Sequence, residues 1–317
     1  MTDILRRVRQ LLPDAVREPL RRIRATLRSA PPQGRDEILS EAERLALTGR
    51  GMKDILRCLR GLSLADFVEL LLEIPNPAYP ALSKVLPRAA SATVQRAWTG
   101  ADGHLLLPET VSFTTLLSNR YRTETGKELA SARVLDFGCG YGRILRAMYY
   151  FCDPEQLYGC DPRAESLEHC RNDGILGHLA ISEYLPDRLP FEGKFDLIFA
   201  YSVLTHTSAR ATKQCLDVLA AACAPNGMIA LTIRPPEYWD VDTGMLLETR
   251  RRCAALHRAE GFAFEPHIWA PIDGDLVYGD TSMTLEWLAQ RSPQLRILAT
   301  EPVPTDPLQR IVYLKPH

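Results

Sequence analysis

The stretch VLDFGCGYGRI, residues 134–144, constrains the fold most. An apolar run that ends in an acid, Asp136, leads directly into three glycines at alternate positions: Gly138, Gly140 and Gly142. Glycine lets a loop adopt conformations that are closed to residues with a Cβ, and it lets a ligand approach the backbone. The helix expected to follow would present free N–H groups and the positive end of its dipole. The stretch therefore predicts a strand, a tight turn and a helix N-terminus that favours an anionic or carboxylate-bearing ligand.

From residue 132 onward, short apolar runs alternate with stretches of helical composition. Five runs are candidate strands: 132–137, 156–161, 177–182, 195–201 and 227–233. Strands buried on both faces are continuously apolar, and their alternation with helices indicates a parallel sheet with right-handed crossovers. Two later runs, 295–301 and 309–315, are expected to pair as a closing edge. The pattern predicts an α/β fold with an open, doubly wound, mostly parallel sheet.

The residues before this sheet have helical periodicity. In SLADFVELLLEIPNP, Ser63 is placed to cap a helix and Pro75 follows its end. We therefore assign residues 1–95 to an N-terminal helical cap and residues 96–317 to the α/β domain.

The start of the chain is basic, with 14 Lys or Arg against 8 Asp or Glu in residues 1–60. Residues 4–28 combine an apolar stripe with eight arginines, so they are able to lie on an anionic membrane surface. We favour packing of the stripe on the α/β domain or on a second copy of the chain, as a homodimer, because two prolines interrupt it. A nucleic-acid substrate is not expected, since the rest of the chain is net acidic.

Other features bound the class of protein. No apolar run reaches 18 residues and no secretory signal begins the sequence, which predicts a cytoplasmic protein. The eight cysteines form no C-x-x-C pair, and no histidine and carboxylate cluster has metal-ligand spacing. We therefore expect free thiols and no metal.

A second acid supports a nucleoside ligand. Asp161 ends the second candidate strand, about twenty residues after the glycines, where it is able to accept two hydrogen bonds from a ribose diol. Each charge-assisted bond of this kind contributes roughly 1.5–3 kcal/mol. The alternative is an acid that caps the following helix. A nicotinamide site is disfavoured, because the dinucleotide pattern G-x-G-x-x-G would require glycine where Arg143 stands.

Four stretches taken in order over residues 132–234 resemble the consecutive motifs of class I S-adenosylmethionine-dependent methyltransferases: VLDFGCGYGRI, YGCDP, FDLIFAYSVLTH and AAACAPNGMIALTIR. The resemblance implies a seven-stranded Rossmann-like methyltransferase sheet and S-adenosyl-L-methionine as cofactor. It is closest to the small-molecule type. VQRAWTG and DPLQRIVYLK also resemble bacterial members linked to sugar or polysaccharide modification.

The resemblance also implies roles for particular residues. Asp136 and the three glycines would hold the methionine part of the cofactor, Asp161 would bind the ribose hydroxyls, and Tyr201 would border the methionine or the transferred methyl group. Ser182 or Glu183 would contact the adenine. Asp196, at the start of the fourth strand, is expected to be structural.

Methyl transfer is an in-line displacement that ends with loss of a proton from the acceptor. His206 follows the fourth strand at its carboxyl end, so it is the candidate catalytic base, with a packing or capping histidine as the alternative. Tyr238 and Trp239 are candidate walls of the acceptor pocket. His267 would line that pocket beside Trp269 and Asp275, although an aromatic core is the favoured interpretation.

The predicted function is methylation of a hydroxyl, or less readily an amine, on a small molecule or glycan. One alternative is a non-catalytic S-adenosylmethionine-binding partner subunit. The other is an NAD-dependent oxidoreductase.

Overall fold

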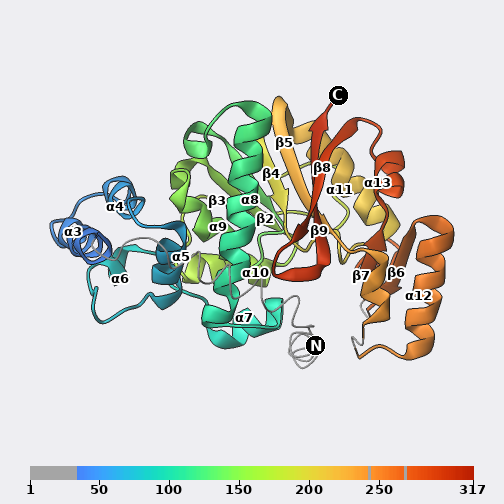
Figure 1. Cartoon of the computed structure of the whole chain (residues 1–317), viewed down its shortest axis with the longest axis horizontal. Helices are drawn as coiled ribbons and strands as arrows, with labels where there is room; N and C mark the ends of the chain where they lie inside the picture. Colours follow the sequence, from blue (N-terminus) through green and yellow to red (C-terminus); the bar gives the residue numbers. More distant parts are fainter. Residues whose placement is uncertain (1–33, 242–243, 268–269) are drawn as a thin grey trace.

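The computed structural model describes residues 34–241, 244–267 and 270–317, and its centre is a seven-stranded sheet (Figure 1). The strand order is β3-β2-β1-β4-β5-β9-β8, in which β9 runs antiparallel to β5 and β8 and all other pairs are parallel. All seven strands predicted from the sequence are present, and the doubly wound fold class is confirmed. The strands are β1 (Val134–Phe137), β2 (Leu157–Asp161), β3 (His178–Ile181), β4 (Phe195–Ala200), β5 (Cys223–Ile233), β8 (Leu295–Val303) and β9 (Asp306–Pro316).

Both faces of the sheet are covered by helices, and each face has its own apolar core. Val134 and Leu197 point into one core and their chain neighbours Leu135 and Ile198 into the other, because successive side chains of a strand alternate. The first core includes side chains of α8 (Leu107–Thr125) and α9 (Arg143–Ala147). The second includes side chains of α11 (Ala209–Ala222) and α13 (Leu285–Arg291). α10 (Ala164–Asn172) contacts β2 and β3.

From residue 35 the chain before the sheet is helical, as predicted, and α3 to α6 lie at one end of the molecule (Figure 1). Ser63 caps α5 by accepting the N–H of Asp66 at 3.1 Å, which confirms the predicted start of that helix. The apolar side chains of these helices belong to the same core as α8 and α9. The helices are α3 (Arg35–Leu47), α4 (Met52–Leu59), α5 (Leu64–Glu73), α6 (Leu82–Val85) and α7 (Ala92–Thr99).

The basic stripe of residues 4–28 lies outside the described residues, so its membrane or homodimer role stays a prediction, as does the boundary at residue 95. No helix of the described part of the chain is long and apolar enough to cross a bilayer.

A small unit that the sequence did not predict is inserted between β5 and α13, at the end of the molecule opposite α3 (Figure 1). It consists of the 3-10 turn η5 (Pro236–Asp240), α12 (Leu247–Glu260) and a two-stranded antiparallel sheet of β6 (Phe262–Pro266) and β7 (Gly279–Met283). An isolated bridge between Thr207 and Tyr278 joins this unit to the loop after β4. The inserted unit therefore reaches the carboxyl edge of the main sheet.

Candidate cofactor and acceptor site

One large cleft, with a volume of about 1320 Å³, lies at the carboxyl ends of β1, β2, β4 and β5. Loops after these strands form its floor, and residues of α7, α8 and the inserted unit form its walls. In an open α/β sheet this edge is where ligands bind. Six of the seven residues predicted for the site line the cleft: Asp136, Gly138, Gly140, Asp161, Tyr201 and His206. Gly142 does not line it.

The glycine turn has left-handed backbone conformations at all three glycines, as its sequence predicts. A Cβ at Gly138, where φ is 77°, would lie 2.4 Å from Cγ2 of Val203 in the loop after β4. A Cβ at Gly140 would lie 3.3 Å from Cδ1 of Trp98 on α7. A Cβ at Gly142 would meet Cys170 and Ile175. The glycines therefore let neighbouring protein segments approach the loop as well as a ligand.

Asp161 ties together the two loops that follow β1 and β2. Its Oδ2 accepts the N–H of Gly140 and its Oδ1 accepts the N–H of Arg163, each at 2.9 Å. Burial raises the pKa of Asp161, against these two hydrogen bonds, which lower it. Because a carboxylate oxygen has two lone pairs, each oxygen still has acceptor capacity for a ribose hydroxyl in the cleft.

Asp136 is a buried acid with an unsatisfied oxygen. Among the described residues, its Oδ2 has no hydrogen-bond partner. Burial, reinforced by the charge of Asp161, raises the pKa of Asp136 well above its usual range. A buried polar atom without a partner carries a free-energy cost, which a cationic ligand group would relieve. The amino group and sulfonium of S-adenosylmethionine are groups of that kind, so the residues of this edge fit the predicted cofactor.

Two contributors to this end of the cleft were missed from the sequence. Arg143 is buried, and its Nη1 lies 2.9 Å from both Oε2 of Glu109 and Oγ1 of Thr110 on α8. Its guanidinium also lies 5.4 Å from the ring centroid of Tyr201. From the sequence, Arg143 was used only as evidence against a dinucleotide pattern. Its pairing with Glu109 of α8 is a tertiary contact that no local sequence pattern indicates.

The other end of the cleft holds a polar cluster centred on Asp280 of β7. Oδ1 of Asp280 accepts hydrogen bonds from Nη1 of Arg234 at 2.6 Å and from the Tyr238 hydroxyl at 2.8 Å. Oδ2 lies 2.9 Å from Nε2 of His267. Burial acts to raise the pKa of Asp280, but the hydrogen bond from His267 and the charge of Arg234 hold it below its usual range. Asp280 is therefore ionised at neutral pH.

His206 belongs to the same cluster. Its Nδ1 lies 2.8 Å from the carbonyl oxygen of Gly279, so Nδ1 is the protonated nitrogen, and Nη2 of Arg234 lies 3.3 Å from Nε2. Its ring stacks on Tyr278 at 5.3 Å. Burial, followed by the charge of Arg234, lowers the pKa of His206 to about 3. The sequence does not show that Arg234 lies against this ring, and the role of His206 as catalytic base stays a prediction.

Of the remaining residues predicted for the site, some line the cleft and others do not. Tyr238 lines the cleft, but Trp239 does not: its indole donates to Oγ of Ser282 at 2.6 Å. Glu183 lines the cleft, so it is the better placed of the two adenine candidates, of which Ser182 is the other. Asp196 is structural, as predicted, because its Oδ2 accepts the N–H of Arg133.

His267 also lines the cleft, so the favoured interpretation as aromatic core is wrong. It pairs with Asp280, whereas the predicted neighbour Asp275 accepts from Ser208 and Trp269 lies outside the described residues. Within the described ranges, no group of three or more His, Cys, Asp or Glu is placed to hold a metal ion.

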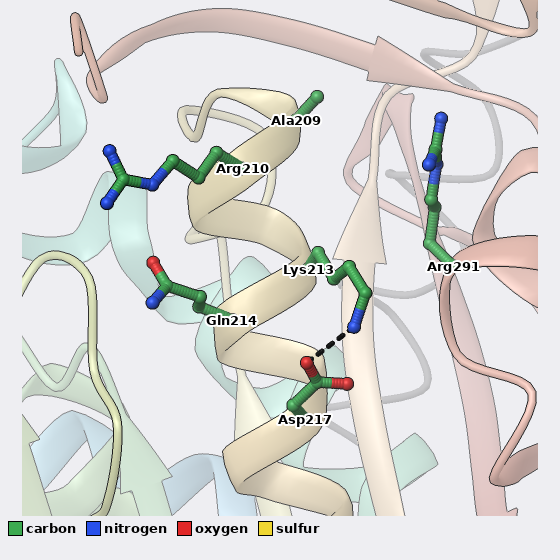
Figure 2. A pocket seen from close by; sticks show the side chains of 6 residues that line it. All are labelled: Ala209, Arg210, Lys213, Gln214, Asp217 and Arg291. Atoms are coloured by element: carbon green, nitrogen blue, oxygen red, sulfur yellow. Dashed lines mark hydrogen bonds and ion pairs between the residues drawn. The ribbon is translucent and has the colours of Figure 1, made fainter.

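A second, shallower depression of about 410 Å³ lies on the outer side of α11 (Figure 2). Lys213 and Asp217 there pair with each other at 2.6 Å, along one face of the helix. None of the predicted site residues lines this depression, which includes Ala209, Arg210, Lys213, Gln214, Asp217 and Arg291.

The large cleft thus joins the loops after β1 and β2 to a polar pocket beyond β4 and β5. The strand order, with one antiparallel strand between β5 and β8, and the position of the cleft fit a class I methyltransferase that uses S-adenosylmethionine. Residues 134–227 match the family model described as a methyltransferase domain. The predicted enzyme class and cofactor are confirmed. The sequence shows no significant similarity to a curated protein.

Solved structures of methyltransferases are similar to the chain at low sequence identity. A S-adenosylmethionine-dependent methyltransferase from Clostridium acetobutylicum ATCC 824 is 15% identical, with 57% of this chain and 82% of that chain covered and a TM-score of 0.40. One from Mesorhizobium loti is 16% identical, with 62% of this chain and 95% of that chain covered and a TM-score of 0.43. Magnesium protoporphyrin IX methyltransferase from Synechocystis PCC 6803 with bound SAH is 13% identical, with 70% of this chain and 92% of that chain covered and a TM-score of 0.45.

Proposed function

We propose that this methyltransferase acts on a hydroxyl, or on an amine, of a small molecule or glycan. The observation that carries the proposal is the size and division of the cleft. Its volume of about 1320 Å³ exceeds the roughly 300–1,000 Å³ of an ordinary ligand pocket. It therefore has room for a cofactor at the glycine turn and a second organic molecule beside Asp280.

At the first end, the cofactor contacts follow from the groups that face the cleft. Asp161 would accept hydrogen bonds from the ribose hydroxyls, and the glycine turn would pass beside the methionine part. Asp136 would face its cationic groups through the unsatisfied Oδ2. Tyr201 lines the cleft between this edge and His206, so we assign it to the border of the transferred methyl group.

At the second end, the lining suits a polar acceptor with a flat face. Tyr238, Tyr278 and His267 contribute rings, and Arg234 and Asp280 contribute charged hydrogen-bonding groups. Aromatic walls with a few convergent polar groups are typical of pockets for small organic ligands, including sugars.

His206, the catalytic base predicted from the sequence, lines the cleft after β4. Its imidazole lies at the acceptor end of the cleft. A role as base requires the lone pair on Nε2, against which Arg234 lies in this structure. Base catalysis by His206 would therefore require Arg234 to move away.

The test is methyl transfer itself. The full chain is incubated with S-adenosylmethionine that carries a labelled methyl group and with a panel of sugars, phenols and amines, and acceptor masses are compared before and after. The proposal predicts a labelled product that carries one added methyl group on oxygen or nitrogen. Transfer to a protein or nucleic acid, with none to any small molecule or glycan, would contradict it.

A further inference from the structure

We propose that His267, held by Asp280, takes the proton from the acceptor, so that the acceptor is a hydroxyl or amine that enters the cleft in its protonated form. This inference rests on the methyltransferase function proposed above. It assigns the proton to a residue of the inserted unit, which lies outside the matched methyltransferase domain.

The position of His267 is fixed from two sides. Its backbone N–H donates to the carbonyl oxygen of Tyr278 at 3.0 Å, directly after β6. Its Nε2 lies 2.9 Å from Oδ2 of Asp280, an ionised carboxylate that accepts only, so Nε2 carries the proton. Nδ1 then carries the lone pair. The side chain is 29% exposed and lines the cleft, and no hydrogen bond from the described residues occupies Nδ1.

The charged group nearest to the His267 ring is a carboxylate. Oδ2 of Asp280 lies against Nε2, while Nη1 of Arg234 and the Tyr238 hydroxyl donate to the other carboxylate oxygen, Oδ1. The neutral His206 lies across the Tyr278 ring, which both histidines contact at centroid distances of 5.3 and 5.4 Å. An imidazolium formed at His267 would therefore face a carboxylate at hydrogen-bonding distance. This is the arrangement in which an acid orients a histidine base and stabilises its charged form.

The two histidines differ in their contact with Arg234. His206 is 16% exposed, with Nδ1 engaged by the Gly279 carbonyl and lying 3.8 Å from Oδ1 of Asp280, and with Nε2 engaged by the Arg234 guanidinium. A proton added to His206 would meet the positive charge of Arg234. A proton added to His267 would lie opposite the negative charge of Asp280.

In the proposed step the acceptor oxygen or nitrogen forms a bond to the methyl carbon while the bond between carbon and sulfur breaks and its electron pair stays on sulfur. The acceptor proton moves to Nδ1 of His267, and the imidazolium later releases it to water. Charge is balanced, because the cationic donor becomes a neutral thioether and one proton is released. A carboxylate acceptor would already be an anion and would not need His267.

The first experiment is an NMR measurement of the histidine ring tautomers of the full chain, with His206→Gln and His267→Gln used to assign the signals. We expect His267 to carry its lone pair on Nδ1 and its proton on Nε2, facing Asp280, and we expect Asp280→Asn to weaken this preference. The exposed His178 on β3 has a ring that lies outside the cleft, so His178→Gln is the matched control and should leave the His267 tautomer unchanged. A proton on Nδ1 of His267 in the wild-type chain would overturn the inference.

The kinetic arm uses an acceptor found with the labelled panel. His267→Gln should lower kcat by about 10²–10⁴-fold, with little change in KM or in the Kd for S-adenosylhomocysteine. The control variant His178→Gln should keep wild-type kcat. If the wild-type chain does not bind S-adenosylhomocysteine, the proposed function fails. If it binds and His267→Gln keeps wild-type kcat, only the assignment of His267 fails.

Discussion

Nη2 of Arg234 lies 3.3 Å from Nε2 of His206. This contact places a permanent cation against the only nitrogen of the ring that is free to accept a proton, because Nδ1 is committed to the Gly279 carbonyl. Both histidines therefore belong to the cluster around Asp280, but only His206 has a guanidinium against its ring. Nε2 of His267 lies 2.9 Å from Oδ2 of Asp280, whereas Nδ1 of His206 lies 3.8 Å from Oδ1.

The first prediction concerns stability in acid. The pKa of His206 is about 3 in the folded chain, against about 6.5 for a histidine in an unfolded one. Between these values the unfolded state binds the proton and the folded state does not, so the free energy of unfolding falls as the pH falls. His206→Gln should make this decline shallower by up to about 1.4 kcal/mol per pH unit between pH 6.5 and 3. Urea denaturation across this range measures it, and an unchanged slope would refute it.

The second prediction concerns the contact between Gly138 and Val203. Gly138→Ala should destabilise the fold by at least ~2 kcal/mol, because a left-handed alanine costs about 1–2 kcal/mol and its Cβ also meets Val203. Val203→Ala removes the clashing methyl group but not the backbone strain. The double variant should therefore be more stable than the sum of the single effects predicts, by about 0.5–3 kcal/mol in a denaturation cycle. Simple additivity would count against this packing.

The third prediction concerns the ribose contact. Asp161→Asn should raise the Kd for S-adenosylhomocysteine about 10–100-fold, because it removes the charge from hydrogen bonds worth roughly 1.5–3 kcal/mol each. Calorimetric titration gives the Kd. Glu165→Gln, an exposed change on the next helix, is the control and should leave it unchanged. Equal affinity of the wild-type and Asp161→Asn chains would exclude Asp161 from the cofactor site.

The fourth prediction concerns the buried pair of Arg143 and Glu109. Arg143→Met should destabilise the fold by about 3–5 kcal/mol, since it leaves the Glu109 carboxylate buried without its cation. Adding Glu109→Gln should restore part of that loss, because the unpaired charge is then gone. Thermal and urea denaturation of the two variants compare them. No recovery in the double variant would mean that the loss comes from packing of the arginine stem.

The sequence predicted the sheet well for a physical reason. Strands buried on both faces have to be apolar throughout, so the runs at β1, β4 and β5 stand out from the helices between them. β7 is buried at all five positions, yet it reads GDTSM, in which Met283 is the one large apolar side chain. It is buried because polar side chains there are hydrogen-bonded, Asp280 to Arg234 and Ser282 to Trp239. Such pairing is tertiary and leaves no periodic pattern.

The two ends of the cleft also differ in how far the sequence predicted them. The glycine turn and Asp161 were predictable, because a tight turn and an acid after a strand are local features of the chain. The acceptor end is built by Arg234, His267 and Asp280, which come from three separate segments and meet only in the folded chain. For that reason the sequence placed His206 correctly in the cleft but gave no indication of the charge beside it.

Calorimetric titration of the full chain with S-adenosylhomocysteine, and separately with NAD, tests the central claim most directly. The account predicts binding of S-adenosylhomocysteine at one site per chain and no measurable heat with NAD. Tight binding of NAD with no binding of S-adenosylhomocysteine would contradict it.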